Sequence, residues 1–492
     1  MAHAHPQDPH PQDLHPQELR APRAVPWRES RPLRRVAAAG AVTLMAGLIL
    51  SRGGASIGWG GEALRVVAWI GLGVLCVASA PRAGLREGYL VTLCGLVTLL
   101  ALVLAPAPAA AMARGLDQAA FLAAFILLLS LLFETALTSP SVGACGEHIA
   151  RQPAGRRHAA LFWGTDVMSV LFNLGIVSML SPLVRRGLPE ADEAVRRDME
   201  RRQVSAILRG FAWGVTWSPT ALAPLALFEL IDGIDRQRWT LLGLGITALV
   251  FALSFAEDLL RGRAHPELEP HTAPPPTPWK AYGRFALAVV ALFALTALIV
   301  VVLDEGIVLG LMTACPLMML GWLALQRQSL AAGARDAARL VVERLPTVGP
   351  VALTLAASGY LGRVGAALIP ADAVEGFVAA IGLPQWGWLT VLPIVMVLLS
   401  YLAVSPIMLA VFFGSLFGAL PALPTDATWL ALSISCGWSV TMTASPFATV
   451  ALLLAKQNEV SGARLTLGWN GPFTLASLAL VAAFFYWLTG GA

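Results

Sequence analysis

Long apolar segments recur from residue 36 to the end of the chain, and they restrict the possible folds more than any other feature. Each segment is about 17–25 residues long, which is the length that an α-helix needs to cross the hydrocarbon layer of a bilayer. Of the 492 residues, 57% are hydrophobic and only 13% are charged, so a soluble protein could not cover its core with polar surface. Because lipid leaves backbone polar groups to be satisfied within the chain, the sequence predicts an all-α polytopic membrane protein.

Two apolar stretches, 159–184 and 386–420, could either cross the membrane or enter it and return as re-entrant hairpins. Both carry polar residues beside a Ser-Pro pair, and non-helical backbone in a membrane is tolerated only where protein or water covers it. The segment 185–202 alternates in charge sign and predicts a surface helix at the cytoplasmic interface. The remaining apolar segments predict about 11 full crossings, at 36–51, 63–80, 88–106, 117–142, 204–230, 239–257, 283–303, 306–325, 341–369, 427–455 and 465–489.

The distribution of basic residues separates the two topologies. If both stretches are hairpins, 26 basic residues lie in cytoplasmic segments and only four, Arg52, Arg114, Arg236 and Arg238, lie outside. If both stretches cross fully, this bias weakens, whereas the positive-inside rule requires it. We therefore predict two hairpins, a cytoplasmic N-terminus, a periplasmic C-terminus and a place in the bacterial inner membrane. The net charge of +4 then reflects topology and contact with anionic membrane lipid, not nucleic-acid binding.

Two polar segments divide the chain. Residues 1–35 hold three tandem pentads (HPQDP, HPQDL and HPQEL) and six arginines, which predicts a disordered His/Pro/Arg-rich cytoplasmic arm. Its histidines could buffer a transition metal, although a solvated tail is the simpler interpretation. Residues 263–282 predict a Pro-rich cytoplasmic linker. The rest of the chain is then an extra first span at 36–60 and two units at 61–262 and 283–492.

The two units have the pattern of inverted copies. In each, two spans precede a third span, a hairpin, a span with an interrupted middle and a closing span. The sequence WGVTWSPTALAPLAL at 213–227 matches WSVTMTASPFATVALLL at 438–454, and MLSPLV at 179–184 matches AVSPIM at 403–408, both at an offset of about 224 residues. Five crossings per unit is an odd number, so the copies must be inverted in the membrane, which is typical of secondary transporters. The alternative is that Ala/Leu-rich spans resemble one another by composition alone.

Two Ser-Pro pairs lie at the centres of predicted spans. Proline lacks an N–H and clashes with the preceding helical turn, so Ser218-Pro219 and Ser445-Pro446 should open their helices. Broken helices can direct positive N-terminal ends at an anion and offer carbonyl groups to a cation. The alternative is a kink whose freed backbone groups are satisfied by neighbouring hydroxyls. The hydroxyl groups flanking the two breaks belong to Thr216, Thr220, Thr441 and Thr443.

Ionisable residues within spans are costly and are therefore functional candidates. Glu134, in the sequence SLLFETAL, and Asp166, on the first arm of the first hairpin, could each carry a coupling proton. Glu134 could instead be a solvated interface residue, and Asp166 could form a surface ion pair with the arginines at 156–157. Arg209 and Arg363 lie near span ends, where we expect them to extend toward the interface.

Motifs of soluble enzymes and of metal sites are missing from the sequence. It contains no GxxxxGK[ST] or HExxH motif and no His/Cys cluster inside a predicted span, so we expect neither an enzyme nor a resident metal. The five cysteines form no CxxC pair, which favours isolated apolar thiols. No cofactor is expected beyond Na⁺ or H⁺ as a coupling ion.

This arrangement of crossings and hairpins resembles the ion transporter superfamily, whose best-known branch is the divalent anion–sodium symporters. The resemblance covers about residues 60–490. In that branch the hairpin tips carry Ser-Asn-Thr motifs; here the corresponding stretches are FNLGIVSMLSPLV (172–184) and AVSPIMLAVFFG (403–414), in which Asn173 and Ser405 match but the full motif is absent. The resemblance implies an elevator-type motion of a transport domain against a scaffold, and a possible homodimer.

These observations together predict a secondary active transporter that moves a small organic anion, coupled to H⁺ or Na⁺. Its site would include Asn173, the 216–220 and 441–445 breaks, and Ser405. One alternative is a membrane-embedded enzyme or a lipid-handling protein, which would need polar catalytic residues at a membrane face. Another is a non-transporting subunit or sensor in which the His-rich arm is the working part.

Overall fold

The computed structural model describes residues 31–55, 61–187, 192–262 and 275–491, and over these ranges the chain is α-helical without strands. The predicted arm at 1–35 and the linker at 263–282 fall mostly outside the described residues. The helices are α1 Arg31–Ala55, α2 Gly61–Ser79, η1 Ala80–Arg82, α3 Leu85–Leu104, α4 Pro108–Leu137, α5 Pro140–Ala150, α6 Ala154–Phe172, α7 Leu174–Arg186, α8 Glu193–Gly214, α9 Leu222–Leu230, α10 Arg236–Gly262, α11 Trp279–Leu303, α12 Ile307–Arg327, α13 Leu330–Ala367, α14 Ala371–Ile381, α15 Gln385–Ser400, α16 Pro406–Phe417, α17 Ala427–Ala444, α18 Thr449–Gln457, the π-helix η3 Arg464–Trp469 and α19 Gly471–Thr489.

The predicted membrane architecture is confirmed. Among the described residues, 10 helices are long and apolar enough to cross a membrane, or 11 if the bent pair α14–α15 counts as one span. The predicted crossing at 204–230 is not among these 10, because it is broken between α8 and α9 and its first half carries charged residues. The predicted surface helix at 185–202 does not form a separate element, since α8 begins at Glu193 and continues without interruption into the span.

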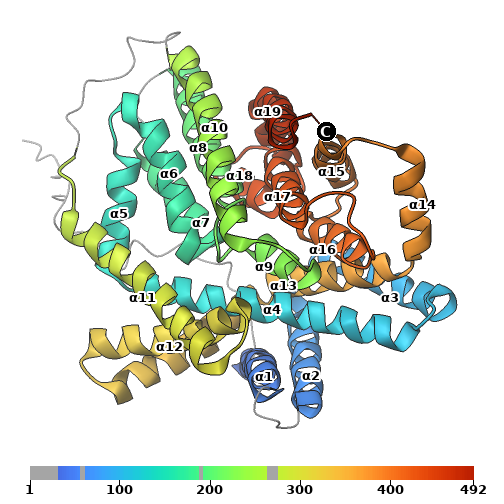
Figure 1. Cartoon of the computed structure of the whole chain (residues 1–492). Coiled ribbons are helices and arrows are strands. Elements are labelled where there is room, and N and C mark those ends of the chain that lie inside the picture. The colour runs from blue at the N-terminus through green and yellow to red at the C-terminus, as the bar shows by residue number, and fades with distance from the viewer. Residues whose placement is uncertain (1–30, 56–60, 188–191, 263–274, 492) are drawn as a thin grey trace, which may run out of the picture.

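Two long helices, α4 and α13, form the central axis of the fold. They pack along each other, and α1, α2, α3 and α12 pack against them (Figure 1). The extra first span is held by close helix contact: a Cβ on Gly40 would lie 2.8 Å from the backbone nitrogen of Leu75 in α2. Small residues of this kind let membrane helices approach closely, so α1 is an integral part of this framework.

Two helix pairs occupy the positions of the predicted hairpins. The first pair, α6–α7, is interrupted at Asn173, which has a left-handed backbone (φ 46°) and whose Oδ1 accepts a hydrogen bond of 2.7 Å from the Leu174 N–H. The second pair, α15–α16, is interrupted at 401–405, where Ala403 has φ 60°. Residues with positive φ end one helix and start the next, so a short non-helical tip joins the two helices of each pair.

The two broken helices connect the hairpins to one another. The first half of each packs on the hairpin that precedes it, α8 on α6 and α17 on α15. The second half of each packs on the other hairpin, α9 on α16 and α18 on α7. Glycine permits the closest approach, because a Cβ on Gly210 of α8 would collide with the carbonyl oxygen of Phe162 in α6. The breaks therefore lie between the two hairpin tips (Figure 1).

Two short helices were not predicted from the sequence. Helix α5 lies between α4 and the first hairpin, and α14 lies between α13 and the second. Both have 11 residues, and α14 meets α15 at an angle of 116°. A helix of this length is too short to produce the apolar period by which spans are recognised.

Candidate functional site

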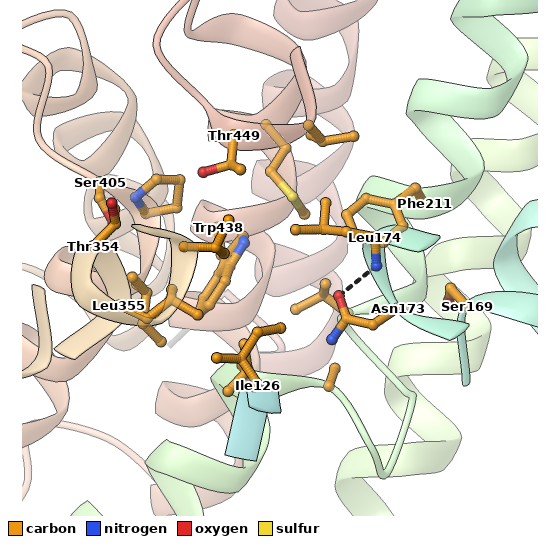
Figure 2. A pocket seen from close by; sticks show the side chains of 18 of the residues that line it. Ile126, Ser169, Asn173, Leu174, Phe211, Thr354, Leu355, Ser405, Trp438 and Thr449 are labelled. Atoms are coloured by element: carbon orange, nitrogen blue, oxygen red, sulfur yellow. Dashed lines mark hydrogen bonds between the residues drawn. The ribbon is translucent and has the colours of Figure 1, made fainter. Parts of the chain in front are cut away.

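A cavity of about 150 Å³ lies where the hairpin tips and the helix breaks meet. Figure 2 shows Asn173 and Ser169 of the first hairpin on one side, and Ser405 with Thr354 of α13 on the other. The indole of Trp438 from α17 lies between them, with Thr449 of α18 nearby. The rest of the wall is largely apolar, which is typical of a site that binds a small molecule.

Four helices begin at this cavity. Its wall includes the first residues of each, namely Leu174 of α7, Leu222 of α9, Pro406 of α16 and Thr449 of α18. The first N–H groups of a helix lack intrahelical partners and carry the positive end of the helix dipole. The N-cap side chains of α9, α16 and α18 make no hydrogen bond to their own helices, so they do not occupy these N–H groups. The cavity is therefore electrostatically suited to an anion.

Three of the predicted binding residues line the cavity: Asn173, Ser218 and Ser405. Each lies at a tip or break where the backbone leaves the helical path. The Ser405 hydroxyl accepts a hydrogen bond of 3.3 Å from Ser358 of α13, and the Ser218 hydroxyl lies 3.1 Å from that of Thr220. Prolines and polar residues at the chain interruptions were a sufficient signal for these three positions.

The other predicted binding hydroxyls do not line the cavity. The Thr216 hydroxyl donates to the Trp213 carbonyl (2.7 Å) and lies 2.8 Å from the hydroxyl of Thr247 in α10. Thr443 makes the same pair of contacts 227 residues later, with Val440 (2.9 Å) and with Thr474 of α19 (3.2 Å). For these two threonines the alternative interpretation holds, because their hydroxyls satisfy the backbone next to the break.

The three remaining hydroxyls are buried. Thr220 donates to the Val170 carbonyl at 2.6 Å, and Ser445 donates to the Ser400 carbonyl at 3.1 Å, so each break is tied to the first arm of its hairpin. The Thr441 hydroxyl is buried without a hydrogen-bond partner among the described residues.

Sequence reasoning missed several residues that line the cavity. Arg86 and Glu87 at the start of α3 are the charged ones, and a Glu87 oxygen accepts a hydrogen bond of 3.2 Å from Thr354. Both charged residues belong to a segment that the sequence places at a membrane edge. Nothing in that segment indicated contact with the two broken helices. Trp438 was visible in the internal match, but its orientation toward the cavity depends on the packing of α17.

Asp166 lies directly behind the cavity wall. Its side chain is fully buried in α6, and the Trp217 indole N–H donates to both carboxylate oxygens at 3.3 and 3.1 Å. The proposed surface ion pair with the arginines at 156–157 is not formed; no cation among the described residues lies within ion-pair distance of this carboxylate.

The other predicted ionisable residues lie elsewhere. Glu134 does not line the cavity and pairs with Arg344 of α13 at 3.3 Å. Arg363 donates to the Ser415 hydroxyl at 3.1 Å. The described residues include no group of three or more His, Cys, Asp or Glu side chains that could hold a metal.

The expectation that Arg209 extends toward the interface is wrong. The side chain is 3% exposed, and its guanidinium contacts Glu257 (2.9 Å), Ser254 (3.1 Å) and Asn470 (2.9 Å). It also lies 3.9 Å from the centroid of the Phe473 ring. A short polar path toward water is what allows an arginine to snorkel; here helices α10 and α19 enclose it instead.

Comparison with solved structures shows a similar fold in another protein. The fold is similar to that in the crystal structure of the YdaH transporter of Alcanivorax borkumensis, described as having an unusual topology, with a TM-score of 0.54 and 14% identity over 83% of this chain and 99% of that one. No protein-family model and no curated protein matches the sequence. At this identity the likeness establishes the fold: the chain is a multi-pass membrane protein with the fold of a transporter.

Proposed function

We propose that this protein is a secondary active transporter that moves a small organic anion across the bacterial inner membrane, coupled to H⁺ or Na⁺. The observation that carries the proposal is the meeting of four helix N-termini at one cavity. Together these ends supply N–H donors and partial positive charge without the desolvation cost of a buried cation. The hydroxyls of Ser218 and Ser405 and the amide of Asn173 add neutral hydrogen-bonding groups at the same place.

The internal arrangement supports an alternating-access mechanism. We infer that residues 61–262 and 283–492 are inverted copies, because α2 to α10 and α11 to α19 follow the same order of long, short and broken helices. The contacts of Thr216 with Thr247 recur in those of Thr443 with Thr474. Inverted repeats with broken helices around a central site are typical of secondary transporters.

An elevator motion is consistent with this arrangement. In the proposed scheme α1, α2, α3, α4, α12 and α13 form the scaffold. The hairpins α6–α7 and α15–α16, together with the broken helices α8–α9 and α17–α18, form the moving unit. Polar contacts between the two bodies include the 3.3 Å contact of Ser358 with Ser405, the 3.1 Å contact of Arg363 with Ser415 and the ion pair of Arg52 in α1 with Glu229 in α9. The side chains of this ion pair are 31% and 23% exposed, so water can reach both charges when the pair separates and re-forms. The same scheme relates the chain to the divalent anion–sodium symporters, although the hairpin tips lack their motif.

Uptake assays in proteoliposomes test the proposal. Purified protein is given a panel of small carboxylates under imposed sodium and proton gradients. We expect gradient-driven accumulation of at least one carboxylate, and a several-fold higher half-saturation concentration in Asn173→Ala and Ser405→Ala. Thr240→Ala is the matched control, because its hydroxyl bonds only to the backbone of its own helix on the exposed side of α10. Absence of accumulation under both gradients, with binding of the panel also absent, would reject the proposal.

A further inference from the structure

Asp166 combines complete burial with the lack of a cationic partner. The Trp217 indole is its one side-chain hydrogen-bond donor among the described residues, and this indole lies in the break between α8 and α9. An ionised carboxylate in such surroundings is strongly disfavoured unless it is paired or neutralised. Protonation provides that neutralisation, because the acid form needs fewer donors and carries no charge.

Gly214 gives the carboxylate access to the cavity. This glycine is the last residue of α8 and lines the cavity, as Ser169 does. A Cβ at Gly214 would lie 2.9 Å from Asp166 Oδ1 and 3.2 Å from Ser169 Oγ. The carboxylate thus lies behind the cavity wall at a position where α8 presents no side chain. Any larger residue at 214 would displace it.

Charged groups on the surrounding helices are engaged elsewhere. Helix α6 packs against α4, α5, α7, α8 and α10. Each of these helices has a titratable or charged group with its own partner: Glu134 with Arg344, His148 with Tyr282, Arg185 with Glu459, Arg209 with Glu257, and Asp258 with Arg202. None of these groups contacts the Asp166 carboxylate, so its charge state can change without breaking an ion pair.

A proton suits this site better than a sodium ion. A hard cation requires several oxygen ligands. Here the indole N–H already contacts both carboxylate oxygens, and the Ser169 hydroxyl donates its hydrogen to the Asp166 carbonyl at 2.6 Å. The part of the chain that the structure describes also has no second carboxylate grouped with Asp166 to form a set of three ligands.

On this geometry, and resting on the proposed transport function, we propose that Asp166 binds the coupling proton and that Gly214 and Trp217 are its positioning residues. A hydronium ion in the cavity transfers one proton to a carboxylate oxygen: one O–H bond forms on the acid, one breaks in the hydronium, and a neutral water molecule remains. An anion in the cavity would repel the ionised carboxylate behind Gly214, so anion binding and proton binding favour each other. The linkage predicts symport, in which the anion and the proton cross together.

The second unit shows that the fold does not require this carboxylate. The Ser400 hydroxyl donates to the Val397 carbonyl at 2.6 Å, as Ser169 does to Asp166. This match gives Val397 the place of Asp166, and the interval of 227 residues that relates Thr216 to Thr443 gives that place to Pro393; both are buried and apolar. At the same interval of 227 residues, Ala444, which precedes the second Ser-Pro pair, takes the place of Trp217. An apolar pair thus fills the same position, which indicates that Asp166 and Trp217 serve a purpose other than packing.

Infrared spectroscopy tests the proton site without a transported solute. The intact protein in lipid vesicles is titrated with pH in D₂O, and the carbonyl stretch of protonated carboxylic acids is recorded. We expect a titrating band that disappears in Asp166→Asn and persists in Glu134→Gln. In Trp217→Phe the band should persist to higher pH, since loss of the two indole hydrogen bonds removes stabilisation of the ionised form. A band that is unaltered in Asp166→Asn, or a Trp217→Phe titration equal to that of the wild type, would overturn the assignment.

A transport measurement separates this inference from the proposed function. For a radiolabelled carboxylate that the wild type accumulates, Asp166→Asn should lose accumulation driven by a pH gradient, and its exchange of that carboxylate should become independent of pH. If Asp166→Asn still accumulates the carboxylate under a pH gradient, the proton site is wrong while the transporter stands. If the wild type accumulates none, the transporter proposal fails, and the infrared titration decides the proton site by itself.

Discussion

Arg209 offers the sharpest test of the packing between the two units. It belongs to α8 of the first unit, and its guanidinium reaches Asn470 and the Phe473 ring at the start of α19 in the second. It also bridges Ser254 and Glu257 of α10. The perturbation is Arg209→Met, which keeps the length and apolar stem of the side chain but removes the charge and all of its donors.

The cost of this change follows from the contacts that are lost. Glu257 keeps Arg261 at 2.9 Å and Ser254 keeps His158 at 2.9 Å, so neither is left without a partner. The Asn470 oxygen loses its donor, which costs about 1–3 kcal/mol when the group is buried. The cation–π contact contributes about 2 kcal/mol at a desolvated site. These two terms sum to about 3–5 kcal/mol, the range for breaking a buried ion pair.

Thermal unfolding in detergent, followed by tryptophan fluorescence, measures the effect. We expect the melting temperature of Arg209→Met to fall by on the order of 5 °C or more. Arg209→Lys should recover only part of the lost melting temperature, because an ammonium group cannot reproduce the planar set of donors of a guanidinium group. A surface arginine, Arg197→Met, provides the baseline, since it pairs only with Glu193 one turn away. If the melting temperature of Arg209→Met falls by no more than that of Arg197→Met, the buried network does not join the units and the reasoning is refuted.

Two further predictions concern packing and topology. Gly210→Ala should lower the melting temperature strongly because its Cβ would collide with the Phe162 carbonyl, whereas Gly245→Ala, which has open space around it, should not; equal effects would contradict the packing of α8 on α6. In a cysteine-free background, a cysteine that replaces Arg197 should react with an impermeant maleimide only from the cytoplasmic side. A cysteine that replaces Gln237 should react only from the periplasmic side. Labelling of both positions from one side would exclude the proposed orientation.

Membrane crossings were predictable from the sequence because their physical basis is local. A run of apolar residues of sufficient length has few alternatives to a helix in lipid. The boundaries were less predictable: α13 begins at Leu330, 11 residues before the apolar run predicted at 341–369, because its charged first turns continue the helix outside the apolar stretch. The same reason joins the charged segment from Glu193 to the span that follows it. Charge marks where a span leaves the lipid, not where its helix ends.

Residues at the site were predictable where the chain itself is interrupted. Asn173, Ser218 and Ser405 stand at tips and breaks, and proline or an unusual polar residue marks such points. Local similarity was less reliable. Ser181-Pro182 lies in the middle of α7, where Asn458 donates to the Ser181 hydroxyl at 2.9 Å, so its match with Ser405-Pro406 joins positions that are not equivalent. Proline in the interior of one helix and at the first position of another has two different roles.

The contrast between the two units also explains where the charges lie. The interval of 227 residues that relates Thr216 to Thr443 places Cys436 at the position of Arg209. The same interval places Phe484 and Phe485 at the positions of Glu257 and Asp258. All three of these counterparts are buried and apolar. An apolar cluster commonly stabilises a fold as well as a buried ion network does, so a unit of this kind can fold with apolar residues at these positions. The charges of the first unit, like Asp166, are therefore best explained by function, while the second unit contributes neutral hydroxyls and helix ends to the shared cavity. On this view one unit carries the proton and both together hold the anion.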